Sequence, residues 1–120
     1  MLVLPLAVAP VAALPDPGDP EWRRWLGPAE LAYSAGLRRA GEHLAARVLA
    51  RRVVADALGW TGEPPWHDIA IHREPSGRPV VVLRGALAGR GSAVPGVSLS
   101  HAAGYAAALA WLPAGRGGPP

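Results

Sequence analysis

The sequence predicts a single α+β domain in which one long helix packs on an antiparallel sheet. Two observations support this fold class: the stretch 42–58 has the apolar spacing of a helix, and the short apolar segments elsewhere alternate with the period of strands. The chain has 120 residues, of which 50% are hydrophobic and 18% charged, so it is long enough for one core and too short for two ordinary domains. We expect one domain over 1–113 and a disordered tail over 114–120.

The opening segment MLVLPLAVAPVAAL is apolar throughout. It lacks the basic start of a signal peptide, and Pro5, Pro10 and its short length exclude a membrane-spanning helix. We therefore predict an N-terminal strand or extended segment, and no membrane association. The next stretch, LPDPGDP, should be a loop because proline fixes φ and removes a backbone donor.

Helical segments are expected to follow this loop. Glu21–Leu26 carries two tryptophans three residues apart, which predicts a short helix with an aromatic face. In GPAELAYSAGL, Pro28 suits the first helical position, and the negative charge of Glu30 is favourable in the first turn. The main helix, 42–58, has an apolar side and should end at Gly59.

The second half of the chain has the pattern of half-buried strands. Ile69 and Ile71 fall on one face of DIAIHRE, and RPVVVLRG supplies a second strand after the turn at PSGRP, so a hairpin is predicted. VSLSHAAGYAAALAWL then contains an alternating strand and an alanine-rich strand. The aromatic residues of this half are interpreted as core residues: Trp60, Trp66, Trp111 and Tyr105.

The chain carries a net positive charge of +3, and all 12 of its basic residues are arginine. This charge favours acidic partners without choosing among phosphates, nucleic acid and acidic proteins. Because no nucleic-acid-binding motif accompanies the arginines, nucleic acid is not an expected partner. The chain has no cysteine, which excludes disulfides, thiolate metal sites and cysteine nucleophiles, and fits a cytoplasmic location.

Several blocks of the sequence match the pattern of a known family. LGPAELAYS is similar to L-T-P-x-E-L-x-Y, and the long helix is followed by PWHDIAIHREPSGRPVVVL and then VSLSHAAGYAAALA, in the family's order and spacing. On these blocks the chain resembles the holo-acyl-carrier-protein synthases, the small 4′-phosphopantetheinyl transferases, from about Leu6 to about Leu112. The resemblance implies the 4′-phosphopantetheinyl transferase-like fold and a homotrimer with sites between neighbouring subunits.

The resemblance also implies a chemistry. Members of the family move phosphopantetheine from coenzyme A onto a serine of an apo carrier protein, with Mg²⁺ bridging phosphate oxygens and held by carboxylates. The carboxylates come from a G-x-D-x-V-E strand near the N-terminus and from an A-A-K-E-A motif in the long helix. At the matching strand positions this chain has Ala7 and Pro10, and in the helix it has Arg51 and Arg52 in place of the lysine and the glutamate.

The replacement of a metal-binding glutamate by Arg52 does more than remove a ligand. A guanidinium repels a divalent cation, whereas a neutral residue would only fail to bind it. We therefore expect no metal site, no Mg²⁺-dependent transfer and no required cofactor. Coenzyme A or phosphopantetheine stays a possible ligand, because arginine binds phosphate in a fork.

The arginines in and before the long helix have two interpretations. In the first they form a solvated face, with Arg52 and Asp56 in an i,i+4 pair worth a few tenths of a kcal/mol. In the second they form a basic surface for an acidic carrier protein or for a phosphopantetheine phosphate. The residues concerned are Arg38, Arg39, Arg47, Arg51 and Arg52.

His101, the last residue of the S-L-S-H motif, is the best remaining candidate for a general acid or base, because imidazole titrates near neutrality. The resemblance places it near the rim of the pocket, and a purely structural role is the alternative. The other histidines lack metal-ligand spacing and are interpreted as surface or strand residues: His43, His67 and His72. The resemblance further suggests residues that approach the cofactor, namely Gly77, Arg78, Pro79 and Ser100; in the alternative, Gly77 and Pro79 only build the hairpin turn.

Three functions stay open at the level of sequence. The leading hypothesis is a degenerate family member, a pseudoenzyme, that binds an acyl carrier protein in polyketide or fatty-acid biosynthesis without Mg²⁺-dependent transfer; the pathway rests on analogy. The second is a repurposed enzyme in which His101 isomerises, dehydrates or cyclises a carrier-bound acyl chain. The third is an active transferase with new metal ligands, such as Glu42 or an aspartate of the DPGDP loop.

Overall fold

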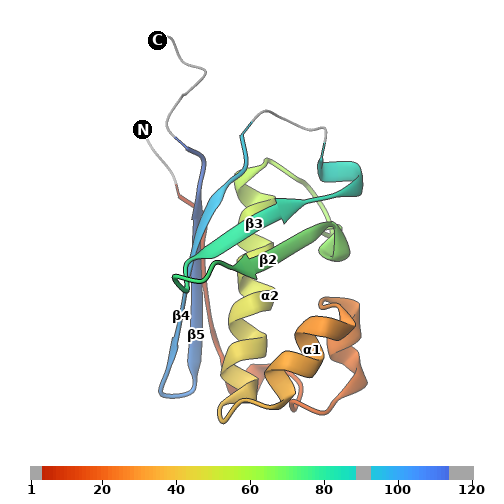
Figure 1. Ribbon diagram of the computed structural model, residues 1–120, viewed down its shortest axis with the longest axis vertical. Coiled ribbons are helices and arrows are strands. Elements are labelled where there is room, and N and C mark those ends of the chain that lie inside the picture. Colours follow the sequence, from red (N-terminus) through yellow and green to blue (C-terminus); the bar gives the residue numbers. More distant parts are fainter. Residues whose placement is uncertain (1–3, 89–92, 114–120) are drawn as a thin grey trace.

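The computed structural model describes residues 4–88 and 93–113 (Figure 1). Its strands and α-helices are β1 (Leu6–Pro10), α1 (Pro28–Ala35), α2 (Ala40–Ala57), β2 (Ile69–Arg73), β3 (Pro79–Leu83), β4 (Gly96–Ala102) and β5 (Tyr105–Trp111). Four short 3₁₀ helices connect them: η1 (Val11–Ala13), η2 (Pro20–Arg24), η3 (Trp66–Asp68) and η4 (Gly85–Leu87). The predicted tail, 114–120, lies outside the described residues.

The strands form two antiparallel sheets rather than one. β1, β5 and β4 make a three-stranded sheet in the order β1-β5-β4, and β2 pairs with β3 in a separate hairpin. α2 runs along the three-stranded sheet, with α1 beside its N-terminal half (Figure 1). Side chains of α2, of both sheets and of η4 meet in one core cluster, which includes Val53, Ile69, Leu87, Val97 and Ala110. The predicted α+β class is confirmed, with the sheet divided in two.

Small side chains on the sheet allow α2 to lie close to it. Ala106, Ala108 and Ala110 alternate along β5 and are buried on its helix side. The intervening residues of β5 point to the other face, because successive side chains of a strand alternate. Tyr105 is therefore 56% exposed and Trp111 37% exposed, so the prediction that these two residues belong to the core is wrong.

The helices largely follow their sequence signals. α1 begins at Pro28, and Glu30 accepts a hydrogen bond from the backbone N–H of Gly27 at 3.4 Å, which caps the helix. α2 ends at Ala57, and Gly59 follows with φ +76°, a conformation that glycine adopts without strain. Within residues 4–88 and 93–113, no helix is long and apolar enough to cross a membrane.

The segment around the first two tryptophans forms a short helix, as predicted over Glu21–Leu26. It is a 3₁₀ helix, η2, and Asp19 caps it by accepting the N–H of Glu21 at 2.8 Å. Pro20 occupies the first position of η2, which ends at Arg24, before Pro28 begins α1. Trp22 is buried and meets Trp25 edge to face at 5.5 Å between ring centroids.

Candidate functional site

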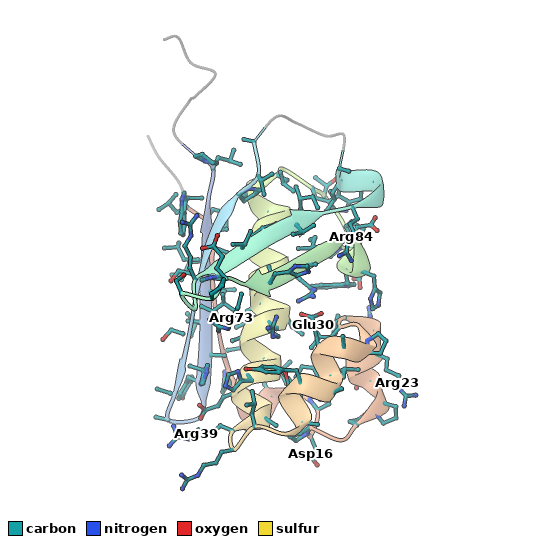
Figure 2. The ribbon with its side chains drawn as sticks, in the orientation of Figure 1. Asp16, Arg23, Glu30, Arg39, Arg73 and Arg84 are labelled. Carbon is teal, nitrogen blue, oxygen red and sulfur yellow. The ribbon has the colours of Figure 1, made fainter. Side chains whose placement is uncertain are left out.

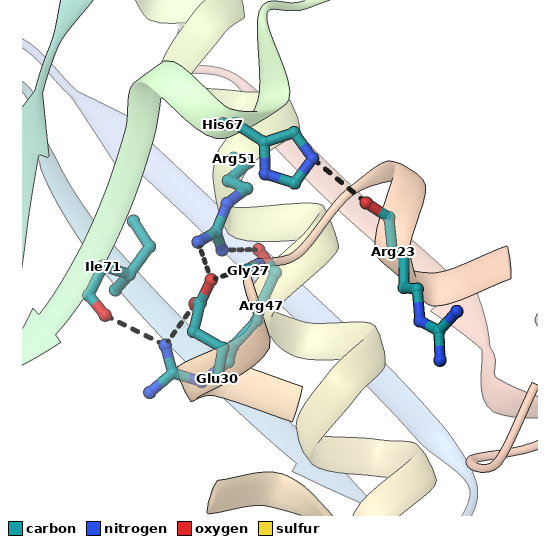
Figure 3. A network of polar contacts seen from close by, with 7 residues as sticks. All are labelled: Arg23, Gly27, Glu30, Arg47, Arg51, His67 and Ile71. Carbon is teal, nitrogen blue, oxygen red and sulfur yellow. Dashed lines mark hydrogen bonds and ion pairs between the residues drawn. The ribbon is translucent and has the colours of Figure 1, made fainter. Parts of the chain in front are cut away.

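Two arginines of α2 point inward and share the carboxylate of Glu30. Arg47 Nη1 lies 3.0 Å from Glu30 Oε2 and donates to the carbonyl oxygen of Ile71 at 2.9 Å. Arg51 bonds the other oxygen of Glu30 through Nη2, and its Nη1 donates to the carbonyl of Arg47 at 3.3 Å (Figure 3). The arginines of the helix and the glutamate of α1 thus form one compact charged cluster.

This cluster places two of the five arginines differently from both interpretations, a solvated face and a basic binding surface. Arg51 is only 2% exposed, and the side chain of Arg47 is 12% exposed, so neither offers its guanidinium to a partner on the surface. Burial lowers the pKa of Arg51, while the hydrogen bond and charge of Glu30 act in the opposite direction. Because Glu30 supplies the counter-charge, both arginines serve the packing of α1 on α2.

Arg52, by contrast, lies on the exposed side of α2. Asp56 is exposed as well, but among the described residues no ion pair joins the two, so the predicted i,i+4 pair does not form. The pKa of Glu63 is lowered first by the hydrogen bond from the Trp66 indole, then by Arg24, and more weakly by the charge of Arg52. Arg52 therefore lies toward the loop that follows α2.

His101 lies over the first turn of α2. Its Nδ1 is 3.0 Å from Oε1 of Glu42, and its ring centroid is 4.5 Å from that of His43, with the two rings inclined by 54°. The second oxygen of Glu42 accepts the backbone N–H of Gly104 at 3.0 Å, in the tight turn between β4 and β5. One carboxylate therefore connects the helix, the histidine and the hairpin turn.

His43 and His101 line a cleft of about 400 Å³ that is also lined by arginines. Its lining residues are Leu37, Arg38, Arg39, His43 and His101. The structure thus brings together His101 and two of the predicted binding arginines, which the sequence analysis treated separately. Arg39 lies at the end of the molecule where the β4–β5 hairpin turns (Figures 1 and 2).

Sequence reasoning missed Glu42 and His43 as companions of His101. Glu42 is separated from His101 by 59 residues, and no spacing motif connects them. The pKa of Glu42 is lowered, chiefly by its hydrogen bond with His101 and then by that with Gly104. The pKa of His43 is lowered, chiefly by burial and then by the positive charges of His101, Arg73 and Arg47. His43 is therefore held in its neutral form near neutral pH.

The cofactor-loop candidates line a second, larger groove. This groove, of about 930 Å³, lies between the β2–β3 hairpin, the first residues of β4 and the last residue of β5. Gly77, Arg78 and Pro79 belong to its lining. Arg73 also lines it and donates to the carbonyl of Gly77 at 2.6 Å. Ser100 is not among the lining residues of this groove; the serine that β4 contributes to the lining is Ser98.

The residues that the resemblance aligns with the family's metal ligands do not suit Mg²⁺. Ala7 packs against the core and Arg52 is exposed, and like Pro10 neither offers an oxygen to a hard cation. Both oxygens of Glu42, a suggested replacement ligand, are already hydrogen-bonded, and Asp19 of the DPGDP loop caps η2. In the part of the chain that the structure describes, no group of three His, Asp or Glu residues could hold a metal ion.

Comparison with known proteins connects this geometry to a family. The chain is 46% identical over 88 residues to the holo-[acyl-carrier-protein] synthase of Moorella thermoacetica, which covers 69% of each chain. Its fold is similar to that of Mycobacterium tuberculosis acyl carrier protein synthase, with 29% identity, a TM-score of 0.69, and 91% of this chain and 94% of that chain covered.

The chain resembles a further solved structure in its fold alone. It is the Helicobacter pylori holo-[acyl-carrier-protein] synthase in complex with coenzyme A, at 20% identity and a TM-score of 0.69, with 92% of this chain and 99% of that chain covered. No protein-family model matches the chain. Given the identity to the Moorella thermoacetica synthase over two thirds of both chains, the chain belongs to the family of holo-[acyl-carrier-protein] synthases.

Proposed function

We propose that the chain binds an acyl carrier protein and does not carry out Mg²⁺-dependent phosphopantetheinyl transfer. One observation carries this proposal: the positions that match the family's metal ligands hold Ala7, Pro10 and Arg52. Mg²⁺ needs oxygen ligands, and a guanidinium at one of these positions adds repulsion to the loss of ligands. The carrier protein is the partner in the name of the Moorella thermoacetica relative, and it is the binding partner proposed for this chain.

The proposed carrier-binding surface consists of the exposed arginines. Because Arg47 and Arg51 are engaged with Glu30, the surface reduces to Arg38, Arg39 and Arg52. Exposed guanidinium groups attract an acidic protein over a distance of about 10 Å at moderate salt and can bind a phosphate in a fork. A net charge of +3 acts in the same direction.

A homotrimer is part of the proposal. The outer face of the three-stranded sheet carries apolar side chains that no other part of the described chain covers, with Leu6 65% and Val8 60% exposed beside Tyr105. An apolar sheet face of this kind is typical of a surface that is buried on association. Covering it with further copies of the same chain would remove these side chains from water.

Coenzyme A or free phosphopantetheine is a possible ligand in this account. The groove beside the β2–β3 hairpin offers two guanidinium groups, those of Arg73 and Arg78, which suit phosphate chemistry. The Helicobacter pylori synthase of similar fold holds coenzyme A. A role in polyketide or fatty-acid biosynthesis and a cytoplasmic location complete the proposal by analogy with the family.

A second candidate function is favoured by the cleft around His101. An imidazole that contacts a carboxylate, next to two guanidinium groups, is suited to proton transfer on a carrier-bound acyl chain. In this alternative the chain would isomerise, dehydrate or cyclise its substrate, with His101 as the acid or base. The carrier-binding surface would be the same in both candidates.

The deciding experiment is a transfer assay. The chain is incubated with apo acyl carrier protein, coenzyme A and Mg²⁺, and the carrier is weighed by mass spectrometry, with the Moorella thermoacetica synthase as the positive control. We expect no phosphopantetheine adduct. An adduct formed at a rate comparable to the control would overturn the proposal and establish an active transferase with other metal ligands.

Binding itself is tested by titrating the carrier protein by calorimetry. Arg39→Glu and Arg52→Glu are expected to weaken binding about tenfold or more, whereas Arg84→Glu, which makes the same change in net charge, leaves it within about twofold. Arg84 is a suitable control because it is exposed and lies on the opposite side of the molecule from Arg39, at the upper right in Figure 2. Equal effects of all three substitutions would contradict the proposed surface.

A further inference from the structure

We propose that Glu42 is a positioning residue that holds the proton of His101 on Nδ1 and thereby presents the unprotonated Nε2 to the cleft. The chemical purpose of this arrangement rests on the second candidate function, in which His101 is the base. The arrangement itself rests only on contacts in the structure, so it can be tested without a substrate.

The direction of the hydrogen bond follows from the two groups involved. An ionised carboxylate can only accept hydrogen bonds, and neutral imidazole has one donor nitrogen and one acceptor nitrogen. The 3.0 Å contact between Glu42 Oε1 and His101 Nδ1 therefore requires the proton on Nδ1. In the neutral ring the lone pair then lies on Nε2, which no group bonds among the residues that the structure describes.

Glu42 is itself held in place by three features. Its Oε2 accepts the backbone N–H of Gly104, its Oε1 lies 4.0 Å from Arg39 Nη1, and it belongs to the first turn of α2, where negative charge is favourable. The lowered pKa of Glu42 means that it stays ionised at neutral pH. A carboxylate fixed on both oxygens sets the orientation of the imidazole as well as its tautomer.

The hairpin turn shows why this contact is stable. Ala103 has φ +52° and Gly104 has φ +82°, the pair of left-handed conformations that a two-residue turn requires. Alanine adopts this conformation at a cost of about 1 kcal/mol. The hydrogen bond from Gly104 to Glu42 helps to hold the turn, and it places His101, three residues earlier, at a fixed height above α2.

The residues around His101 suit a base that becomes positively charged when it takes up a proton. His43 lies beside the ring of His101 and is held neutral by burial, so it adds little repulsion when His101 takes up a proton. Glu42 then balances the imidazolium. The guanidinium groups of Arg38 and Arg39 line the same cleft and can stabilise negative charge that a substrate oxygen gains as its proton passes to Nε2.

The test is a multiple-bond ¹H–¹⁵N NMR spectrum of the histidine rings in the full-length protein at neutral pH. This spectrum distinguishes Nδ1–H from Nε2–H imidazole and needs no ligand. We expect His101 to be in the Nδ1–H form, although neutral imidazole in water favours the other tautomer. An Nε2–H signal for His101 in the unmodified protein would overturn the inference directly.

Variants show whether Glu42 is responsible. Glu42→Ala should remove the preference for Nδ1–H, Glu42→Gln should retain it in part because the amide oxygen can still accept, and Glu21→Ala should not change it. Glu21 is an exposed carboxylate of η2 that does not line the cleft, and its removal changes the net charge equally. An Nδ1–H form that persists in folded Glu42→Ala would also refute the inference. If Glu42→Ala does not fold, the spectrum of the unmodified protein still decides.

Failure of this inference and failure of the proposed function give different results. An Nε2–H tautomer leaves the binding of carrier protein and the transfer assay unaffected. A phosphopantetheine adduct in the transfer assay overturns the proposed function, whichever tautomer His101 adopts.

Discussion

Glu30 of α1 holds Arg51 of α2 in the interior of the protein, where the guanidinium is almost inaccessible to water. Removal of one partner from a buried ion pair leaves an uncompensated charge, and this typically costs about 3 kcal/mol or more. Glu30→Gln should therefore lower the free energy of unfolding by about 3 kcal/mol, measured by urea denaturation.

The matched control is Glu74→Gln. Glu74 is exposed and lies 4.0 Å from Arg78, so this change should alter the free energy of unfolding by less than about 0.5 kcal/mol. Equal effects of the two substitutions would show that the Glu30 cluster is not the buried network that the structure indicates.

His43 should make the protein less stable in acid. The pKa of His43 is lowered in the folded protein relative to its ordinary value of 6.5, so the unfolded chain binds more protons once the pH falls below 6.5. The free energy of unfolding should thus decline as the pH falls below 6.5, and NMR titration of His43 should give a midpoint under 6.5. A His43→Gln variant should lose this part of the decline; an unchanged pH profile would contradict the prediction.

The outer face of the three-stranded sheet should control association. Val8→Lys places a charge on the exposed apolar face of β1, and we expect it to convert a trimer into monomers in analytical ultracentrifugation. Tyr33→Lys, a change at an exposed residue of α1, should leave the trimer intact. A monomeric unmodified protein would refute the homotrimer, and equal dissociation by both variants would refute the sheet face as its interface.

Much of the fold can be predicted from local patterns. The alternation of Ile69 and Ile71 identified β2, and the apolar spacing and Gly59 located α2 to within two residues at its start and one at its end. The alanine-rich segment of β5 predicts a strand, but alanine does not indicate which face of that strand is buried. For this reason the outward direction of Tyr105 and Trp111 could not be predicted.

The candidate site was harder to predict because it depends on contacts between distant segments. The inward direction of Arg51 is determined by a glutamate 21 residues earlier, and the environment of His101 by one 59 residues earlier. Only the packing of α1 and of the β4–β5 hairpin on α2 brings these residues together. His101 itself was identified through its motif, whereas Glu42 and His43 were not.

A calorimetric titration of the protein with Mg²⁺ in the presence of coenzyme A tests directly whether the chain holds a magnesium site. Because the resemblance aligns Ala7, Pro10 and Arg52 with the family's metal ligands, we predict no saturable binding at millimolar Mg²⁺; the Moorella thermoacetica synthase under the same conditions serves as the positive control. Stoichiometric binding of Mg²⁺ to this protein, with an affinity comparable to that control, would contradict the central claim.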